Sequence, residues 1–106
     1  MASVVSRSAD HSVVDAGALS MSKDAGVATD GSMGLLVDPS SGTTLPSAPR
    51  LLGLSQEHGK LDRPLPVGTL VRILPNHSCL TAACFDHAWV VRGERVTARW
   101  RIWNGR

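Results

Sequence analysis

The sequence predicts a mostly β fold, either a small barrel or a sandwich. Short apolar runs rich in valine recur along the chain, and glycine, proline, aspartate and serine separate them, which is typical of strands joined by turns. The 106 residues suffice for one domain of ordinary size, so residues 1–106 are expected to form a single unit. Apolar residues make up 42% and charged residues 19% of the chain, a balance that favours a globular protein over a disordered one.

The expected strands follow from these apolar runs and from the residues that end them. The first two, at residues 3–7 and 12–16, are close enough in sequence to form a hairpin through residues 8–11. The clearest strand, at residues 68–74, ends abruptly at Pro75-Asn76. The remaining candidates lie at residues 50–57, 88–92 and 95–102.

Two other stretches have a different character. Residues 39–49 are dominated by proline, serine, threonine and glycine, and this composition predicts a flexible loop. Residues 17–24 are compatible with a short turn of helix or with an extended crossover, because eight residues are too few for periodicity to distinguish the two.

Gly93-Glu94 separates the last two expected strands and predicts a two-residue hairpin loop. Side chains alternate along the final strand, so it is expected to have an apolar and a polar face. The apolar face would hold Val96, Ala98, Trp100 and Ile102, and the polar face Arg95, Thr97, Arg99 and Arg101. Trp89, Trp100 and Trp103 supply most of the aromatic bulk and are expected to anchor a core or an interface.

Charge and cysteine usage exclude several classes of partner. Eleven Lys and Arg residues against nine Asp and Glu residues give a net charge of +2 without a basic block, so charge does not support a nucleic-acid partner. The chain has no apolar run long enough to span a membrane, and residues 1–10 lack the apolar run of a signal peptide. Cys79 and Cys84 are therefore expected to be reduced thiols of a cytoplasmic protein.

His77-Ser78-Cys79 is the sharpest chemical feature, and it follows the strand expected at residues 68–74. In an extended segment, residues two apart point to the same face, so the imidazole of His77 and the thiolate of Cys79 could meet on one ion. A nitrogen and a soft sulfur suit zinc or another divalent metal, and two protein ligands leave positions open for water or substrate. The alternative is structural, with the histidine at a strand end and the cysteine buried.

Residues 66–82, with Asp86 and Trp89-Val90-Val91, resemble the C-terminal domain of the D-serine dehydratase and D-threonine aldolase family. Earlier blocks are similar to that family in the same order, so that the resemblance covers nearly the whole chain. These blocks are residues 4–7, residues 13–17 with Leu19-Ser20 and Lys23-Asp24, and residues 54–59.

The resemblance implies a mostly β domain that supplies a metal site to a pyridoxal-phosphate enzyme. In the family, this domain follows an alanine-racemase-like β/α barrel whose lysine carries the cofactor, and that barrel is absent from the present sequence. His77 and Cys79 match the zinc ligands of dehydratase-like members, which convert D-serine into pyruvate and ammonia. Aldolase members with an acidic second ligand differ from this chain at Cys79. The resemblance therefore favours a dehydratase and leaves retro-aldol cleavage of D-threonine open.

The same resemblance implies a homodimeric complete enzyme, a D-amino-acid substrate and, for this chain by itself, no catalysis. Neither Lys23 nor Lys60 lies in the family's cofactor-lysine context. The family often has His-Asp where this chain has Phe85-Asp86. The alternative function is that of a remnant, or of a separately encoded zinc-binding module that pairs with another chain.

Other polar residues have two readings each. Glu57 and His58 either approach an active site or form a strand end that turns at Gly59. Cys84 is expected to be a buried free thiol, with a third metal ligand or a disulfide as the alternatives. Asp15 and Asp86 either orient neighbouring groups or act in turns and caps.

Overall fold

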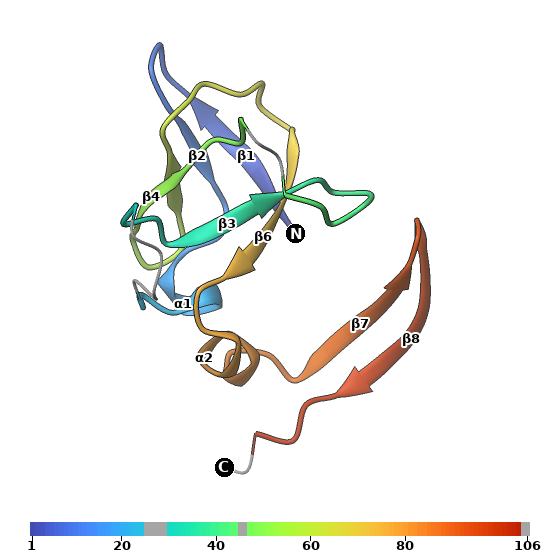
Figure 1. Ribbon diagram of the computed structural model, residues 1–106. Helices are drawn as coiled ribbons and strands as arrows, with labels where there is room; N and C mark the ends of the chain where they lie inside the picture. Colours follow the sequence, from blue (N-terminus) through green and yellow to red (C-terminus); the bar gives the residue numbers. More distant parts are fainter. Residues whose placement is uncertain (25–29, 45–46, 105–106) are drawn as a thin grey trace.

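The computed structural model describes residues 1–24, 30–44 and 47–104 of the chain. Strands dominate these residues, which confirms the predicted mostly β class (Figure 1). In chain order the elements are β1 (Ala2–Arg7), β2 (Ser12–Val14), α1 (Ala18–Met21), β3 (Gly34–Val37), β4 (Leu51–Leu54), β5 (Gly59–Leu61), β6 (Leu70–Pro75), α2 (Ser78–Ala83), β7 (His87–Arg92) and β8 (Arg95–Arg101). No helix in the described part of the chain is long and apolar enough to cross a membrane.

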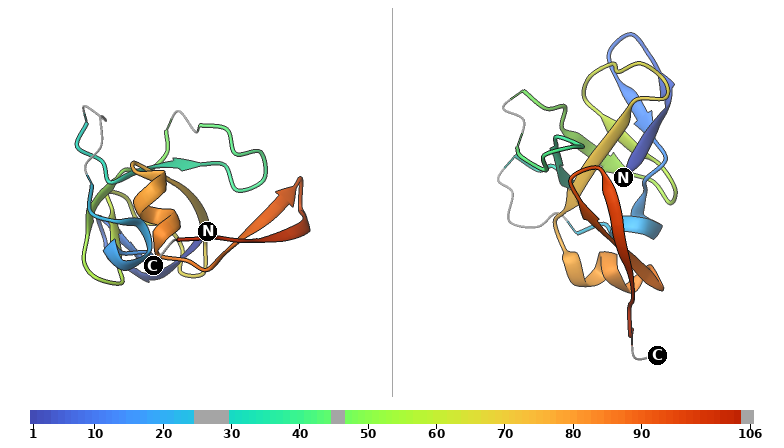
Figure 2. Two further views of the ribbon diagram at one scale, coloured as in Figure 1. Left: turned by 90° about the horizontal axis from the view of Figure 1, so that it is seen from below. Right: turned by 90° about the vertical axis from the view of Figure 1, so that its right-hand side faces the viewer.

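Six strands form a nearly closed antiparallel barrel, in the order β3-β6-β1-β2-β5-β4 (Figure 2). The two edge strands of this sheet approach one another, because the Met33 N–H just before β3 donates to the Leu51 carbonyl of β4 at 2.8 Å. The predicted hairpin of the first two strands is present, and the Ser8 N–H closes it on the His11 carbonyl at 2.9 Å. Of the two predicted architectures, the barrel is the one observed.

The barrel interior is filled by aliphatic side chains from four of its strands. Val4, Val14, Leu51 and Leu61 are each at most 1% exposed. Burying aliphatic side chains of this size contributes about 1.5–3 kcal/mol each relative to leaving them in water. The barrel therefore contains the hydrophobic core of the described residues, and Met21 of α1 packs into the same core.

The helix α1 is fixed to the turn that joins β4 to β5. The N–H groups of Ala18 and Leu19 donate to the carbonyls of Ser55 and Gln56 at 2.8 and 3.0 Å. Gly17 permits this close approach, since a Cβ there would lie 2.5 Å from backbone atoms of residues 56–58. The stretch 17–24, which the sequence left open, thus contains a short helix.

The strand predicted at residues 50–57 is wrong in its second half. Strand β4 ends at Leu54, and both the N–H and the hydroxyl of Ser55 donate to the His58 carbonyl. The apolar run stops at Leu54, and the side-chain bond of Ser55 favours a turn over a continued strand. That turn leads into β5, which the sequence did not predict, and β3 was also missed.

Two other strands each differ from their predicted bounds by two residues at one end. The strand expected at 12–16 ends at Val14, and the strand expected at 68–74 begins at Leu70. Part of the flexible loop expected at 39–49 lies outside the described residues, at 45–46. Before that gap the chain turns in an ordered way, since the Asp38 carboxylate accepts the N–H groups of Ser40 and Ser41. The flexibility of the loop stays a prediction.

The last two strands form the predicted hairpin, which projects from the barrel as a separate two-stranded sheet (Figures 1 and 2). Val90 pairs with Ala98 and Ala88 with Trp100, so these side chains share the apolar face that alternation predicted. The prediction is wrong for Val96, which pairs with Val91 beyond an irregularity in the register at Val90–Val91 and therefore lies on the other face, with Trp89. Both faces are uncovered, with Val96 62% and Trp100 64% exposed.

The expectation that the tryptophans anchor a core is wrong, because Trp89 and Trp103 are also 63% and 81% exposed. Arginines cover part of them: Arg99 lies over Trp89 at 5.3 Å and Arg101 over Trp103 at 4.4 Å from the ring centre. Cation–π contacts of this kind are compatible with exposed rings. Their role as interface anchors stays a prediction.

Candidate metal centre

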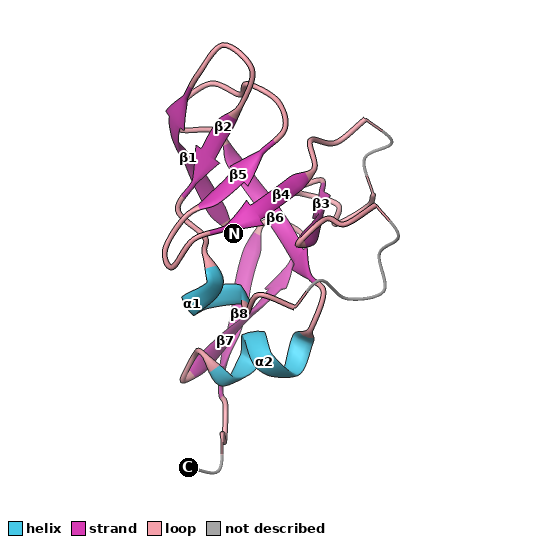
Figure 3. Ribbon diagram, turned by 90° about the vertical axis from the view of Figure 1, so that its left-hand side faces the viewer, coloured by secondary structure: helices cyan, strands magenta, loops and turns pink. Residues whose placement is uncertain are grey.

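His77 and Cys79 lie where β6 leads into α2, at the end of the barrel that also carries α1 (Figure 3). Pro75 ends the strand, and His77 is the N-cap residue of α2 with an extended backbone at φ −130° and ψ 98°. Cys79 is the second residue of the helix. The helix begins immediately after His77, since the Thr81 N–H donates to the His77 carbonyl at 3.1 Å, four residues earlier.

The expectation that His77-Ser78-Cys79 forms one extended segment is therefore wrong. Pro75 ends the ladder with β3, and the small residues Ser78, Ala82 and Ala83 are compatible with a helix in place of further strand. The alternation argument for a shared face does not hold within a helix. The alternative of a buried cysteine is also wrong, because Cys79 is exposed.

The imidazole of His77 is held by a carboxylate that is distant in sequence. His77 Nδ1 lies 2.8 Å from Asp24 Oδ2, just after α1, and both side chains are partly exposed. Two further contacts join the same segments, and a third connects Asn76 to Ser32. The Asn76 amide donates to the Asp24 carbonyl at 3.2 Å and the Ser32 carbonyl at 2.8 Å, and Thr81 Oγ1 lies 3.0 Å from the Met21 carbonyl.

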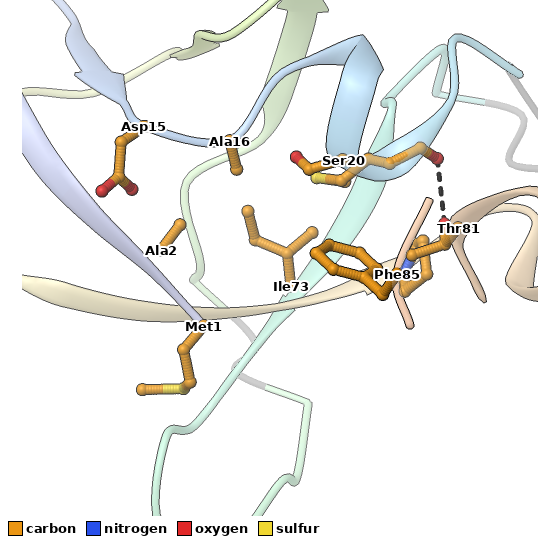
Figure 4. Close-up of a pocket in the computed structure, with 10 residues that line it drawn as sticks. Met1, Ala2, Asp15, Ala16, Ser20, Ile73, Thr81 and Phe85 are labelled. Atoms are coloured by element: carbon orange, nitrogen blue, oxygen red, sulfur yellow. Dashed lines mark hydrogen bonds between the residues drawn. The ribbon is translucent and has the colours of Figure 1, made fainter. Parts of the chain in front are cut away.

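A cleft of about 270 Å³ opens between β1, α1, β6 and α2, and it adjoins this region (Figure 4). Phe85 forms an aromatic part of its lining, at the position where the family often has histidine. Asp15 lies on the opposite side, and its carboxylate accepts the Ser3 N–H at 2.6 Å. Of the two roles expected of Asp15, orienting a neighbouring group is the one observed, and the group is the backbone N–H of Ser3 in β1.

The other candidate residues are placed elsewhere. Glu57 and His58 lie on the turn before β5 and line a second cleft with Asp15 and Leu19. Cys84 is a free thiol at the C-cap of α2, but the expectation that it is buried is wrong, because the helix end that carries it is exposed. Its Sγ lies 3.2 Å from the Leu80 carbonyl. The Asp86 carbonyl accepts the Ile102 N–H at 2.8 Å, which closes the base of the β7–β8 hairpin.

The donor chemistry at this barrel end fits a divalent metal with an open coordination sphere. In the described residues no group of three or more His, Cys, Asp and Glu side chains is placed to hold an ion. An imidazole and an exposed thiol supply the nitrogen and sulfur that zinc accepts, and further positions would be filled by water or substrate. Sequence reasoning missed Asp24, whose partner lies 53 residues away, although Lys23-Asp24 stood out in the family resemblance.

Fold and donor groups together define a small β-barrel domain with a candidate metal centre at one end. The family model for the putative serine dehydratase domain matches residues 1–91. The chain belongs to this family, which confirms the resemblance seen in the sequence.

Three curated relatives illustrate the match. D-threo-3-hydroxyaspartate dehydratase of Delftia sp. (strain HT23) is 34% identical over 121 residues, which cover 99% of this chain and 31% of the dehydratase. D-serine dehydratase of Schizosaccharomyces pombe is 34% identical over 88% of this chain and 22% of that enzyme. An uncharacterized protein of Mycobacterium tuberculosis is 41% identical over 58 residues, or 50% of this chain and 44% of that protein.

Solved structures give the same picture. The Delftia dehydratase superposes with a TM-score of 0.77 at 32% identity, over 95% of this chain and 31% of that one. A cysteine-to-alanine variant of the same enzyme has been solved in the metal-free form and has the same TM-score. D-threonine aldolase from Filomicrobium marinum has a TM-score of 0.76 at 30% identity, over 98% of this chain and 27% of that one. The chain thus spans less than a third of these enzymes.

Proposed function

We propose that this chain is the metal-binding domain of a pyridoxal-phosphate-dependent lyase that acts on a 3-hydroxy D-amino acid. The observation that carries the proposal is the pair of donors at the β6–α2 junction, a partly exposed His77 and an exposed Cys79, in a chain of the serine dehydratase domain family. The names of the relatives share a substrate class, since D-serine, D-threonine and D-threo-3-hydroxyaspartate are all 3-hydroxy D-amino acids.

Each donor has a distinct task in the proposal. His77 would bind through Nε2, because Nδ1 faces Asp24, and Cys79 would bind as a thiolate. A zinc or other divalent ion, when bound, supplies Lewis-acid stabilisation of the substrate's 3-hydroxyl group. The partial exposure of His77 and the exposure of Cys79 leave the site accessible to a substrate that the rest of the enzyme presents.

Dehydration is favoured over aldol cleavage by the residue at position 79. Cys79 matches the dehydratase-like pattern of the resemblance, whereas aldolases with an acidic second ligand differ there. A cysteine-to-alanine variant of the Delftia dehydratase has been solved in the metal-free form, which is compatible with a cysteine ligand in that enzyme. Loss of water from D-serine would give 2-aminoacrylate, which tautomerises to the imine and is hydrolysed by water to pyruvate and ammonia.

The remainder of such an enzyme would carry the pyridoxal phosphate. This chain spans 31% of the Delftia dehydratase, and neither Lys23 nor Lys60 is placed in a cofactor-binding context by the resemblance. We expect the partners to be a barrel domain with the cofactor lysine and a second subunit, in a cytoplasmic homodimer. By itself the chain is expected to bind no stoichiometric pyridoxal phosphate.

One observation favours a second candidate, a zinc-binding module that pairs with another chain. The 58 matched residues already make up 44% of the Mycobacterium tuberculosis relative, so that protein is also much shorter than the dehydratases. Pull-down of a separate barrel protein by this chain would support that candidate over a domain of one long enzyme.

Metal analysis of three alanine variants tests the proposed site. The chain and its variants are dialysed against zinc, and bound metal is measured together with the folded fraction. His77→Ala and Cys79→Ala should lose zinc, because each removes one of two protein ligands. Cys84→Ala is the matched control and should keep it. Full zinc occupancy in both of the first two variants would refute the site, and loss in Cys84→Ala would mean a third ligand.

A further inference from the structure

We propose that Asp24 is the positioning residue of the metal centre: its carboxylate holds His77 with the proton on Nδ1 and turns Nε2 toward the ion. The inference rests on the proposed function, and it concerns a residue to which the family resemblance gives no role. It starts from the 2.8 Å contact between Asp24 Oδ2 and His77 Nδ1.

The chemistry of imidazole gives this contact its meaning. A neutral histidine carries one proton, and the nitrogen that lacks it is the one that binds a metal. A carboxylate accepts hydrogen bonds and donates none, so a neutral His77 beside Asp24 carries its proton on Nδ1. The lone pair is then on Nε2. Carboxylates in this position fix the tautomer and the ring orientation of metal-binding histidines and raise their basicity.

The contact differs from a mobile surface ion pair, because the backbone of Asp24 is itself held. The Asn76 side chain, which directly precedes His77, donates to the Asp24 carbonyl at 3.2 Å. The same amide also donates to the Ser32 carbonyl at 2.8 Å, two residues before β3 begins at Gly34. The histidine and its carboxylate are thus connected twice, once through side chains and once through Asn76.

A third contact holds the helix that carries Cys79. Thr81 Oγ1 lies 3.0 Å from both the Met21 carbonyl at the end of α1 and the His77 carbonyl at the start of α2. The segment that follows α1 is therefore joined to the segment that holds both proposed ligands. Movement of the Asp24 backbone away from His77 would require the bond from Asn76 to break as well.

A contribution to folding stability does not account for the Asp24–His77 pair. Both side chains are more than 40% exposed, and exposed ion pairs contribute little to folding. Orienting a ligand needs no large contribution to folding. A loss of the carboxylate should therefore appear in metal affinity and in the histidine tautomer, and only weakly in stability.

The first measurement is the tautomer of His77 in the metal-free chain. Nitrogen-15 NMR at a pH where histidine is neutral distinguishes a protonated Nδ1 from a protonated Nε2. The wild type should show predominantly the Nδ1–H form, and Asp24→Ala should shift toward the Nε2–H form usual for a free imidazole. Asp24→Asn should lie between, because its amide oxygen still accepts a hydrogen bond.

The second measurement is zinc affinity by competition with a chromophoric chelator. Asp24→Ala should bind zinc about 10–100-fold more weakly than the wild type, the usual effect of removing such a partner. The chain offers a matched control in Asp10, whose Oδ1 lies 2.7 Å from His11 Nδ1 on the β1–β2 turn. Asp10→Ala removes the same kind of pair elsewhere and should leave zinc affinity unchanged.

The outcomes separate this inference from the function on which it rests. Wild-type tautomer and affinity in Asp24→Ala, with zinc lost in His77→Ala, would overturn the positioning role and keep the metal site. No zinc binding by the wild type would overturn both. If Asp24→Ala binds zinc more weakly but is also unfolded, Asp24→Asn decides the question, because asparagine keeps the size of the side chain. The His77 tautomer must shift in folded Asp24→Asn for the inference to stand.

Discussion

Asn76 joins the segment that carries Asp24, after α1, to the segment that carries His77, and a substitution at Asn76 tests this connection. Its amide group donates to the carbonyls of Asp24 and Ser32, and Ser32 is only 6% exposed. Asn76→Asp preserves the shape of the side chain and replaces the donor by a carboxylate, which cannot donate to either carbonyl. Each lost hydrogen bond costs about 1 kcal/mol, and a buried carbonyl left unpaired costs about 1–3 kcal/mol.

We therefore expect Asn76→Asp to lower the free energy of unfolding by about 2–4 kcal/mol at pH 7. For a chain of this size that corresponds to a decrease in Tm of at least about 10 °C. Urea unfolding followed by far-UV circular dichroism measures the change. Asn104→Asp, at an exposed position near the C-terminus, is the control and should change stability by less than about 0.5 kcal/mol. Equal stability of the Asn76 variant and the wild type would refute the reasoning.

Three further changes probe other parts of the molecule. The chain should self-associate through the uncovered β7–β8 hairpin, whose two faces expose Val96 and Trp100, and the double variant Val96→Ser/Trp100→Ser should be more monomeric by analytical ultracentrifugation; an unchanged mass would count against association through the hairpin. Gly17→Ala should destabilise the barrel by at least about 2 kcal/mol, since the new Cβ would displace the turn at 56–58, and a wild-type melting curve would contradict the packing. The N–H and hydroxyl of Ser41 hold the pKa of Asp38 below its usual value of 3.8, so its turn is stabilised above that pH and released as the pH falls through the lower, folded value; a carboxyl NMR titration with a pKa at or above 3.8 would disprove this.

The fold class was predictable because it depends on local signals. Apolar runs that end at Gly, Pro, Asp and Ser indicated strands, and Gly93-Glu94 indicated the last hairpin. The strands β3 and β5 were not predictable in this way, because they have only four and three residues and are defined by their neighbours. Tertiary pairing decides such short segments.

The site was predictable in its residues more than in its geometry. His77 and Cys79 stood out through their neighbourhood and through the family resemblance, but the helix that carries Cys79 was not expected. Asp24 could not be connected to His77 by spacing, since folding alone brings the two side chains together. The apolar face of the hairpin was visible in part as an alternation, but the irregular register that places Val96 on the other face, and the exposure of both faces, became apparent only in three dimensions.

The ligand set of the bound metal tests the central claim most directly. X-ray absorption at the zinc edge, on the zinc-loaded chain, reports the type, number and distance of the ligand atoms. We expect one sulfur ligand, from Cys79, at about 2.3 Å from the zinc and one imidazole nitrogen, from His77, at about 2.0–2.1 Å, with oxygen in the remaining positions. A zinc shell with no sulfur, or one with two sulfurs and no imidazole, would contradict the claim.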